Sequence, residues 1–405
     1  MTVSVAIDLA LDRLFTYEVP EALQGKLAVG QLLSVPFGHR EARGFAMAVG
    51  TDAKGRGEGG GRGYSLKSVS GIVDETPFFS PKLLELVRKV AAYTGAPLES
   101  VLRAALPAAV LKKEVRPREL LFIESALASA TVPVTKRQQW LADQIARLGG
   151  GWMTQLCKEL KTTPATIREL GRLGLVTVSV RAKRRDPLAN RRILPSKPLP
   201  LNGEQKSALE AICAADRPIL LFGVTGSGKT EVYLQAIAAE MKAGRGAIVL
   251  VPEISLTPQT VQRFASRFGG GIAVLHSALS NGERYDEWHR IRSGEARVVI
   301  GPRSAVWAPV RNLGLIVVDE EHEGCYKQDE LPRYHARDVA VLRGALEGAK
   351  VVLGSATPSL ESWMNVKRGK YACAAMANRA GAGTLPTIRL TDLNEENAGG
   401  AIFSK

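Results

Sequence analysis

The spacing of apolar and polar positions changes twice along the chain. In the first part, short apolar stretches alternate with polar residues, a pattern typical of half-buried β-strands. The middle part has the spacing of amphipathic helices, and the last part alternates apolar strands with helices, which favours a parallel sheet covered on both faces. We therefore expect a β-rich domain, a helical domain, a linker and an α/β domain, in that order, at residues 1–107, 115–185, 186–200 and 201–385.

The N-terminal region predicts a small β-barrel or sandwich. A Gly- and Arg-rich insert at 54–63 is expected to be a loop, because so many glycines lose much conformational entropy on ordering. A helical stretch at 81–93 closes the domain. The expected strands are 3–9, 14–19, 32–38, 43–49 and 67–73.

The region after residue 135 has the order helix, helix, turn, helix and strand. Thr163 and Pro164 are expected to cap the third helix, and Gly174 to end it. This order predicts a helix-turn-helix or winged-helix domain, and a generic three-helix bundle is the alternative. The expected helices are 138–148, 153–160 and 165–173, followed by a strand at 175–180.

A basic, proline-punctuated segment follows, with Arg and Lys at 181–185 and 191–192 and prolines at 195, 198 and 200. A solvated linker is the default interpretation of such a run. Contact with nucleic-acid phosphates is the alternative, given the charge of the whole chain.

The α/β region places its polar motifs directly after apolar strands. Ligands of parallel sheets bind at the carboxyl ends of the strands, so we expect these motifs to form one site. The expected strands are 219–222, 247–251, 273–275, 298–300, 315–318 and 351–353.

A phosphate-binding loop follows the first of these strands. Its glycines leave room for backbone N–H groups to reach phosphate at the N-terminus of the next helix, where the helix dipole favours negative charge. Lys229 would reach the β and γ phosphates, and the Thr230 hydroxyl would ligate Mg²⁺. A Gly-rich turn with an incidental lysine is the alternative. The expected ATP-binding residues of the loop are Gly223, Val224, Thr225, Gly226, Ser227, Gly228, Lys229 and Thr230.

An acidic pair ends the strand at 315–318. Asp319 would hold Mg²⁺, and Glu320 would orient or deprotonate the water that attacks the γ phosphate, so both count with Lys229 as catalytic candidates. An acidic N-cap of the next helix is the alternative.

Three further positions complete the predicted nucleotide site. Gln205 would read an adenine edge, because an amide offers both a donor and an acceptor. Ser355 and Thr357 follow the last strand, where their hydroxyls could sense the γ phosphate, although a plain turn explains them almost as well.

Composition supports a polyanionic partner and excludes several other classes. The chain has 54 Lys and Arg against 40 Asp and Glu, a formal net charge of +14, and nucleic acid is the usual partner of such a protein. We find neither an apolar run of membrane-spanning length nor a signal peptide, and expect a cytoplasmic protein without a membrane partner. The 4 cysteines are far apart and indicate neither a zinc site nor a disulfide framework.

The motifs at 223–230, 319–322 and 355–357, in this order, resemble motifs I, II and III of superfamily 2 helicases. More narrowly, the strings at 223–233, 251–259 and 333–338 resemble the PriA-type replication-restart helicases, and the resemblance covers essentially the whole chain. It implies an α/β fold: a RecA-like parallel-sheet P-loop lobe, preceded by a winged-helix domain and a small β-rich N-terminal DNA-binding domain.

The resemblance implies an ATP-dependent 3′-5′ DNA helicase that binds stalled or abandoned replication forks and initiates primosome assembly. Its cofactors would be ATP and Mg²⁺, and its partners forked and single-stranded DNA, primosome proteins and the single-stranded DNA-binding protein. His322, Ser355 and Thr357 would link DNA contact to the nucleotide.

The resemblance also implies DNA-binding residues. Phe15, Gly38 and Lys67 match the family's pocket for a 3′ end, but Thr16 stands where an Asp is expected, which puts the contact to the terminal hydroxyl in doubt. In the lobe, Pro302 stands where a Thr is expected. The matching lobe positions are Arg303 in a strand-end motif, and Lys327, Arg333 and Tyr334 in an aromatic-rich loop that is otherwise an ordinary surface loop.

Members of the family continue with a second lobe, a zinc-binding insertion and a C-terminal domain, so we expect 386–405 to begin such a downstream region. Two-lobe motors use arginine from the second lobe to stabilise charge in hydrolysis, and the 405 residues are expected to turn over poorly. A non-hydrolysing fork-binding scaffold and an RNA-directed helicase are the alternative functions.

Overall fold

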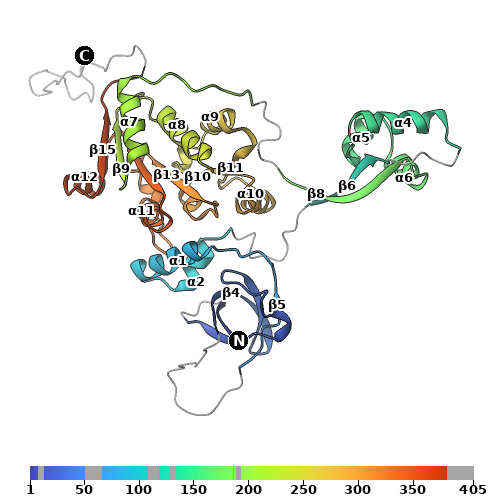
Figure 1. Cartoon of the computed structure of the whole chain (residues 1–405), viewed down its shortest axis with the longest axis horizontal. Coiled ribbons are helices and arrows are strands. Elements are labelled where there is room, and N and C mark those ends of the chain that lie inside the picture. The colour runs from blue at the N-terminus through green and yellow to red at the C-terminus, as the bar shows by residue number, and fades with distance from the viewer. Residues whose placement is uncertain are drawn as a thin grey trace, which may run out of the picture.

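The computed structural model describes residues 1–7, 13–50, 66–107, 118–126, 133–185, 187 and 193–380. Three separate sheets organise these residues (Figure 1). The predicted loop at 54–63 and the region 386–405 lie outside the described residues. None of the helices in the described ranges is long and apolar enough to cross a membrane.

The N-terminal sheet has five strands in the order β2-β1-β4-β3-β5. The stretch predicted as a strand at 67–73 divides its contacts: Ser68 bridges Glu18 of β2, whereas β5 pairs with β3 at the opposite edge. It therefore brings the two edges together around a core that includes Val5, Tyr17 and Leu33. The strands are β1 (Thr2–Ile7), β2 (Phe15–Glu18), β3 (Leu32–Phe37), β4 (Arg40–Gly50) and β5 (Gly71–Ile72).

Two helices connect this sheet with the rest of the molecule. Helix α1 (Pro81–Thr94) begins at Ser80, whose hydroxyl accepts the N–H of Leu83, and buries Leu84, Leu86 and Val87. Helix α2 (Leu98–Ala104) was not predicted, because seven residues are too few to show a clear helical period. Both helices lie between the N-terminal sheet and the large sheet (Figure 1).

The middle domain has the predicted winged-helix fold. A three-stranded sheet in the order β7-β6-β8 packs against three helices around Ile123, Leu141, Ile145 and Ile167. Its first strand was not predicted. The elements are β6 (Arg118–Ser125), α4 (Lys136–Arg147), β7 (Gly151–Trp152), α5 (Met153–Glu159), α6 (Pro164–Arg172) and β8 (Val176–Lys183).

The α/β region forms the expected RecA-like lobe: a parallel sheet in the order β11-β12-β10-β13-β14-β9-β15. All six predicted strands are present, and β15 is an additional edge strand. Consequently β9 lies between β14 and β15, and β13 lies between β10 and β14. The strands are β9 (Ile219–Gly223), β10 (Gly246–Leu250), β11 (Ile272–Val274), β12 (Val298–Gly301), β13 (Leu313–Asp319), β14 (Lys350–Ser355) and β15 (Ala372–Met376).

Helices lie on both faces of this sheet (Figure 1). Each face has its own cluster of buried apolar side chains. Successive residues of the central strands point to opposite faces, so Ile316 belongs to one cluster and Val317 to the other. The helices are α7 (Gly203–Ala214), α8 (Lys229–Lys242), α9 (Pro258–Phe268), α10 (Asn281–Ser293), α11 (Ala336–Glu347) and α12 (Leu360–Lys367).

Candidate nucleotide and DNA sites

The phosphate loop joins β9 to α8 as predicted. Gly226 and Gly228 have φ of 82° and 83°, a conformation that L side chains rarely adopt. At Gly228 a Cβ would also lie 2.3 Å from Nε2 of Gln205. Both glycines are thus required by the backbone, and the loop leaves its N–H groups near the N-terminus of α8.

Lys229 is held inside the loop that it is predicted to serve. Its ammonium donates to the carbonyl oxygen of Gly223 at 2.7 Å, and the residue is buried. The hydroxyl of Ser227 is buried without a hydrogen-bond partner. An anion in the loop could accept hydrogen bonds from both groups: from the Lys229 ammonium, in place of the Gly223 carbonyl, and from the Ser227 hydroxyl. Both observations therefore fit a loop that binds an anion.

Gln205 supports the loop from outside. In the first turn of α7, its Oε1 accepts the N–H of Asn202 at 2.9 Å, and its Nε2 donates to the carbonyl oxygen of Ser227 at 3.0 Å. Both ends of the amide are therefore engaged within the protein. The predicted contact with an adenine edge stays a prediction, and it would use the remaining amide proton.

The acidic pair and the phosphate loop face the same cavity. Asp319 ends β13 and Glu320 follows it, and both line a cavity of about 820 Å³ together with loop residues Thr225–Thr230. The arrangement follows from the sheet order, because β14 alone separates β13 from β9. Thr230 and Asp319 offer hydroxyl and carboxylate oxygens, the ligands that Mg²⁺ prefers.

The environment of Asp319 disfavours its charge. Burial, together with the neighbouring Glu320 carboxylate, raises the pKa of Asp319 to about 6, although the Tyr233 hydroxyl donates to its Oδ1 at 3.0 Å. Two neighbouring carboxylates disfavour each other's charge, and a bound cation would relieve that repulsion. Glu320 itself has a φ of 44°, a strained value for a residue with a side chain.

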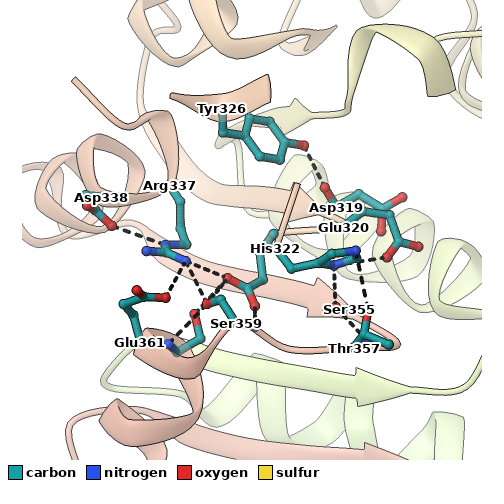
Figure 2. A network of polar contacts seen from close by, with 12 residues as sticks. Asp319, Glu320, His322, Tyr326, Arg337, Asp338, Ser355, Thr357, Ser359 and Glu361 are labelled. Atoms are coloured by element: carbon teal, nitrogen blue, oxygen red, sulfur yellow. Dashed lines mark hydrogen bonds and ion pairs between the residues drawn. The ribbon is translucent and has the colours of Figure 1, made fainter. Parts of the chain in front are cut away.

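The three predicted coupling residues meet at the end of β14 (Figure 2). Nδ1 of His322 lies 2.8 Å from the Ser355 hydroxyl, and Nε2 lies 3.3 Å from the Thr357 hydroxyl. The same ring lies 3.8 Å from the carboxylate of Glu320. The histidine therefore connects the two strand ends, which a plain turn at 355–357 does not require.

Sequence reasoning missed a second network on the other side of His322. Glu321 is fully buried, and its carboxylate accepts Nη1 of Arg337 at 3.1 Å. It also accepts the N–H and hydroxyl of Ser359, at 2.7 and 2.9 Å, and the hydroxyl of Ser362 at 2.8 Å (Figure 2). The sequence contains one signal for this network: Glu321 is the third of three consecutive acids, and the nucleotide site needs only Asp319 and Glu320.

Tyr326 is the first residue of the predicted aromatic-rich loop at 326–335, and sequence reasoning gave it no role of its own. Its hydroxyl donates to the carbonyl oxygen of Asp319 at 2.6 Å, and the side chain is buried. The predicted aromatic-rich loop therefore begins at a residue that contacts the acidic pair, and ends just before Arg337.

A second cavity, of about 850 Å³, brings together Arg303, Lys327 and Tyr334. Arg333 does not line it, and its Nε donates to the carbonyl oxygen of Asp329 at 3.0 Å. The ring of Tyr334 is buried edge-on against Trp307, with centroids 5.6 Å apart. Stacking of a base on Tyr334 is not available in this conformation, so the expected DNA contacts of Arg333 and Tyr334 stay predictions.

The three expected 3′-end residues gather at one place on the N-terminal sheet. Phe15 packs edge-on against Phe37, with centroids 5.2 Å apart, and Lys67 donates to the carbonyl oxygen of Gly38 at 3.2 Å. The guanidinium of Arg13 lies over the Phe15 ring, 4.6 Å from its centroid. An aromatic ring under a guanidinium, with the ammonium of Lys67 held at Gly38, suits a nucleotide end.

Comparison with known proteins identifies the domains in which the two candidate sites lie. Residues 4–107 match the 3′ DNA-binding domain (3′BD) of PriA, and residues 202–366 match the DEAD/DEAH box helicase family. The replication restart protein PriA of Bacillus subtilis is 36% identical over 97% of this chain and 58% of its own length. The chain is thus similar to PriA over nearly its whole length. The PriA proteins of Chlamydia pneumoniae and Haemophilus influenzae are 34% and 35% identical over 95% and 98% of this chain.

The chain spans little more than half the length of these PriA relatives, 52% and 54% for the latter two. Within the PriA family match, the 3′ DNA-binding domain contains the Phe15 cluster, and the helicase domain contains the phosphate loop and the acidic pair.

Proposed function

We propose that the chain contributes the fork-binding and ATP-binding parts of a 3′-5′ DNA helicase that restarts replication. The observation that carries this proposal is the single cavity lined by the phosphate loop, Asp319 and Glu320. DNA is proposed as the substrate because the relatives are named replication restart protein and residues 4–107 match a 3′ DNA-binding domain. Primosome proteins and the single-stranded DNA-binding protein are proposed as partners.

The geometry suggests how the residues act on ATP. The ammonium of Lys229 exchanges the Gly223 carbonyl for phosphate oxygens, and backbone N–H groups of the loop receive the rest of the chain of phosphates. Thr230 and Asp319 would hold Mg²⁺, which neutralises charge on the phosphates. Glu320 orients the attacking water. His322 contacts Glu320, Ser355 and Thr357, so a movement of Glu320 would be transmitted to the two hydroxyls.

Lys229→Ala tests the proposal. Loss of the ammonium should abolish DNA-stimulated phosphate release and weaken binding of an ATP analogue by at least tenfold, with little change in fork binding. Lys242→Ala is the matched control, because Lys242 is an exposed lysine at the other end of the same helix.

Hydrolysis and nucleotide binding are measured separately in this test. Wild-type protein that binds the analogue but releases no phosphate on saturating fork DNA would support a nucleotide-bound scaffold instead of a motor. DNA-stimulated release that survives in Lys229→Ala would refute the assignment of the phosphate loop.

A further inference from the structure

The N-terminal domain is fixed to the lobe by a buried contact. The rings of Phe78 and Trp288 stack with centroids 5.2 Å apart, and the guanidinium of Arg292 lies over both rings. Arg292 also pairs with both carboxylate oxygens of Asp74, at 3.0 and 3.2 Å, and donates to the carbonyl oxygen of Thr76 at 2.7 Å. These contacts hold α1 and α2 in a defined place beside the lobe.

One consequence is that α2 and the residues after it form a wall of the 850 Å³ cavity. Ser100 and Arg103 line it together with Ala104–Pro107, with the strand-end motif at 302–304 and with residues of the aromatic-rich loop at 326–335. The cavity that contains the predicted DNA-binding residues is therefore shared between the N-terminal domain and the lobe.

The charge of this cavity favours a polyanion. Four cationic side chains, Arg103, Arg284, Arg303 and Lys327, face two carboxylates, Glu253 and Asp329. Between them the lining is apolar, with Leu275, Trp307 and Leu331. Phosphates suit the cations, and sugar and base faces suit the apolar lining, which a duplex with stacked bases would not offer.

Arg103 is built to present its charge at this place. Its Nε donates to Oε1 of Glu99 at 2.8 Å, one helical turn earlier, and the Glu99 side chain is 8% exposed. The Arg103 side chain is 56% exposed, so the carboxylate orients the guanidinium at a place that solvent reaches. A fixed guanidinium loses little entropy when it meets a phosphate.

We propose that single-stranded DNA passes between α2 and the aromatic-rich loop, and that Arg103 contacts a phosphate of this strand. The inference rests on the proposed function and adds to it a second DNA contact of the N-terminal domain. This contact is distinct from the 3′-end cluster at Phe15, Gly38 and Lys67, because none of those residues lines the cavity.

The test measures binding of a 3′-blocked oligothymidylate by fluorescence anisotropy over a range of salt concentrations. The blocked end removes the contribution of the 3′-end cluster. Arg103→Gln should weaken binding about three- to fivefold near 0.1 M salt and reduce the slope of log K against log salt by about 0.7, the value for one phosphate of a single strand. Arg103→Lys should restore most of the slope.

Lys89→Gln is the matched control. Lys89 is an exposed cation on α1 that pairs with Glu85 one turn earlier, as Arg103 does with Glu99, but it does not line the cavity. Arg103→Gln with wild-type affinity and slope, or Lys89→Gln with an equal loss, would overturn the proposal.

Two further measurements separate the causes of a negative result. Binding of an ATP analogue by Arg103→Gln should equal that of the wild type, which shows that the lobe is folded. A photo-crosslinking residue at position 100 should label the blocked strand whether or not Arg103 contributes affinity, and no label there would also contradict the path. Wild-type protein that binds neither analogue nor DNA would instead refute the proposed function.

Discussion

At the scale of the residue, the nucleotide site places a carboxylate, Asp319, where burial and a neighbouring carboxylate make its ionisation unfavourable. Asp319 lies beside Glu320, and its pKa is raised to about 6 because burial and the second carboxylate disfavour its ionised form. Glu320 carries backbone strain at the same point. Such costs at neighbouring residues are typical of a site arranged for binding a cation at the expense of the unliganded fold.

The first prediction at this scale concerns Asp319→Asn in metal-free protein. Between the ordinary pKa of 3.8 and about 6, the folded wild type holds a proton that the unfolded chain has lost, so its stability falls as pH rises through this window. The side chain of Asp319→Asn does not titrate, so the stability of the variant does not fall in this window. Its free energy of unfolding in urea should exceed the wild-type value by about 1 to 3 kcal/mol at pH 7.5, with a smaller difference at pH 4.5.

Saturating Mg²⁺ and nucleotide should reverse the order of the two proteins at pH 7.5, because only the wild type has the carboxylate. Urea titrations that stay parallel at both pH values would show that Asp319 bears no such cost.

At the scale of the element, the strands of the large sheet that sequence predicted are those with uninterrupted apolar runs. Buried parallel strands such as Leu313–Asp319 need such runs, so their pattern is unambiguous. Strand β15 (Ala372–Met376) is made mostly of alanine, and β6 (Arg118–Ser125) has charged residues at both ends, so neither has a distinctive period. Their pairing partners, distant in the chain, decide their structure.

The site divides in the same way. The phosphate loop and the acidic pair follow single strands, so local sequence indicates them and the sheet order brings them together. The contacts of Glu321 with Arg337 and Ser359 join the turn after β13, the first turn of α11 and the N-cap of α12, and no local pattern contains that information. Likewise, the position of Tyr334 against Trp307 depends on packing alone.

A double-mutant cycle on Glu321 and Arg337 tests this network. Arg337→Gln leaves the buried Glu321 carboxylate without its cation, and Glu321→Gln leaves Arg337 only the exposed carboxylates of Asp338 and Glu361. Each variant should lower the free energy of unfolding by about 3 kcal/mol. The double variant should cost less than the sum of the two, by about 1 kcal/mol or more. Additive losses in chemical denaturation would show that the two charges are not coupled.

At the scale of the whole molecule, two arginine contacts attach the smaller domains to the lobe. Arg292 joins Asp74 and Phe78 of the N-terminal domain, and Arg185 of the winged-helix domain pairs with Asp286 at 3.2 Å. Both partners in the lobe lie on α10, within a few residues of each other. Helix α10 therefore contacts both smaller domains, and the N-terminal domain also contacts α11, where Lys82 donates to the carbonyl oxygen of Glu347.

Arg292→Ala should loosen the N-terminal domain without unfolding the lobe. Loss of the paired charge and of the contacts with Phe78 and Trp288 leaves Asp74 unpaired. Hydrogen exchange should then be faster in α1 and α2 by about tenfold, and unchanged in β13 and β14. Arg311→Ala, an exposed substitution on the same lobe, should alter neither, and equal exchange rates in α1 for both variants would refute the anchoring role.

The place of β9 between β14 and β15 has a consequence for synthesis on the ribosome. The strand that ends in the phosphate loop emerges early, yet both of its neighbours in the sheet, at 350–355 and 372–376, emerge much later. Until then Leu220 and Leu221, fully buried in the finished lobe, have no strand beside them. A nascent chain that has released β9 but neither β14 nor β15 would expose these apolar side chains and the unpaired edges of β9. Chaperones would be expected to act on this form.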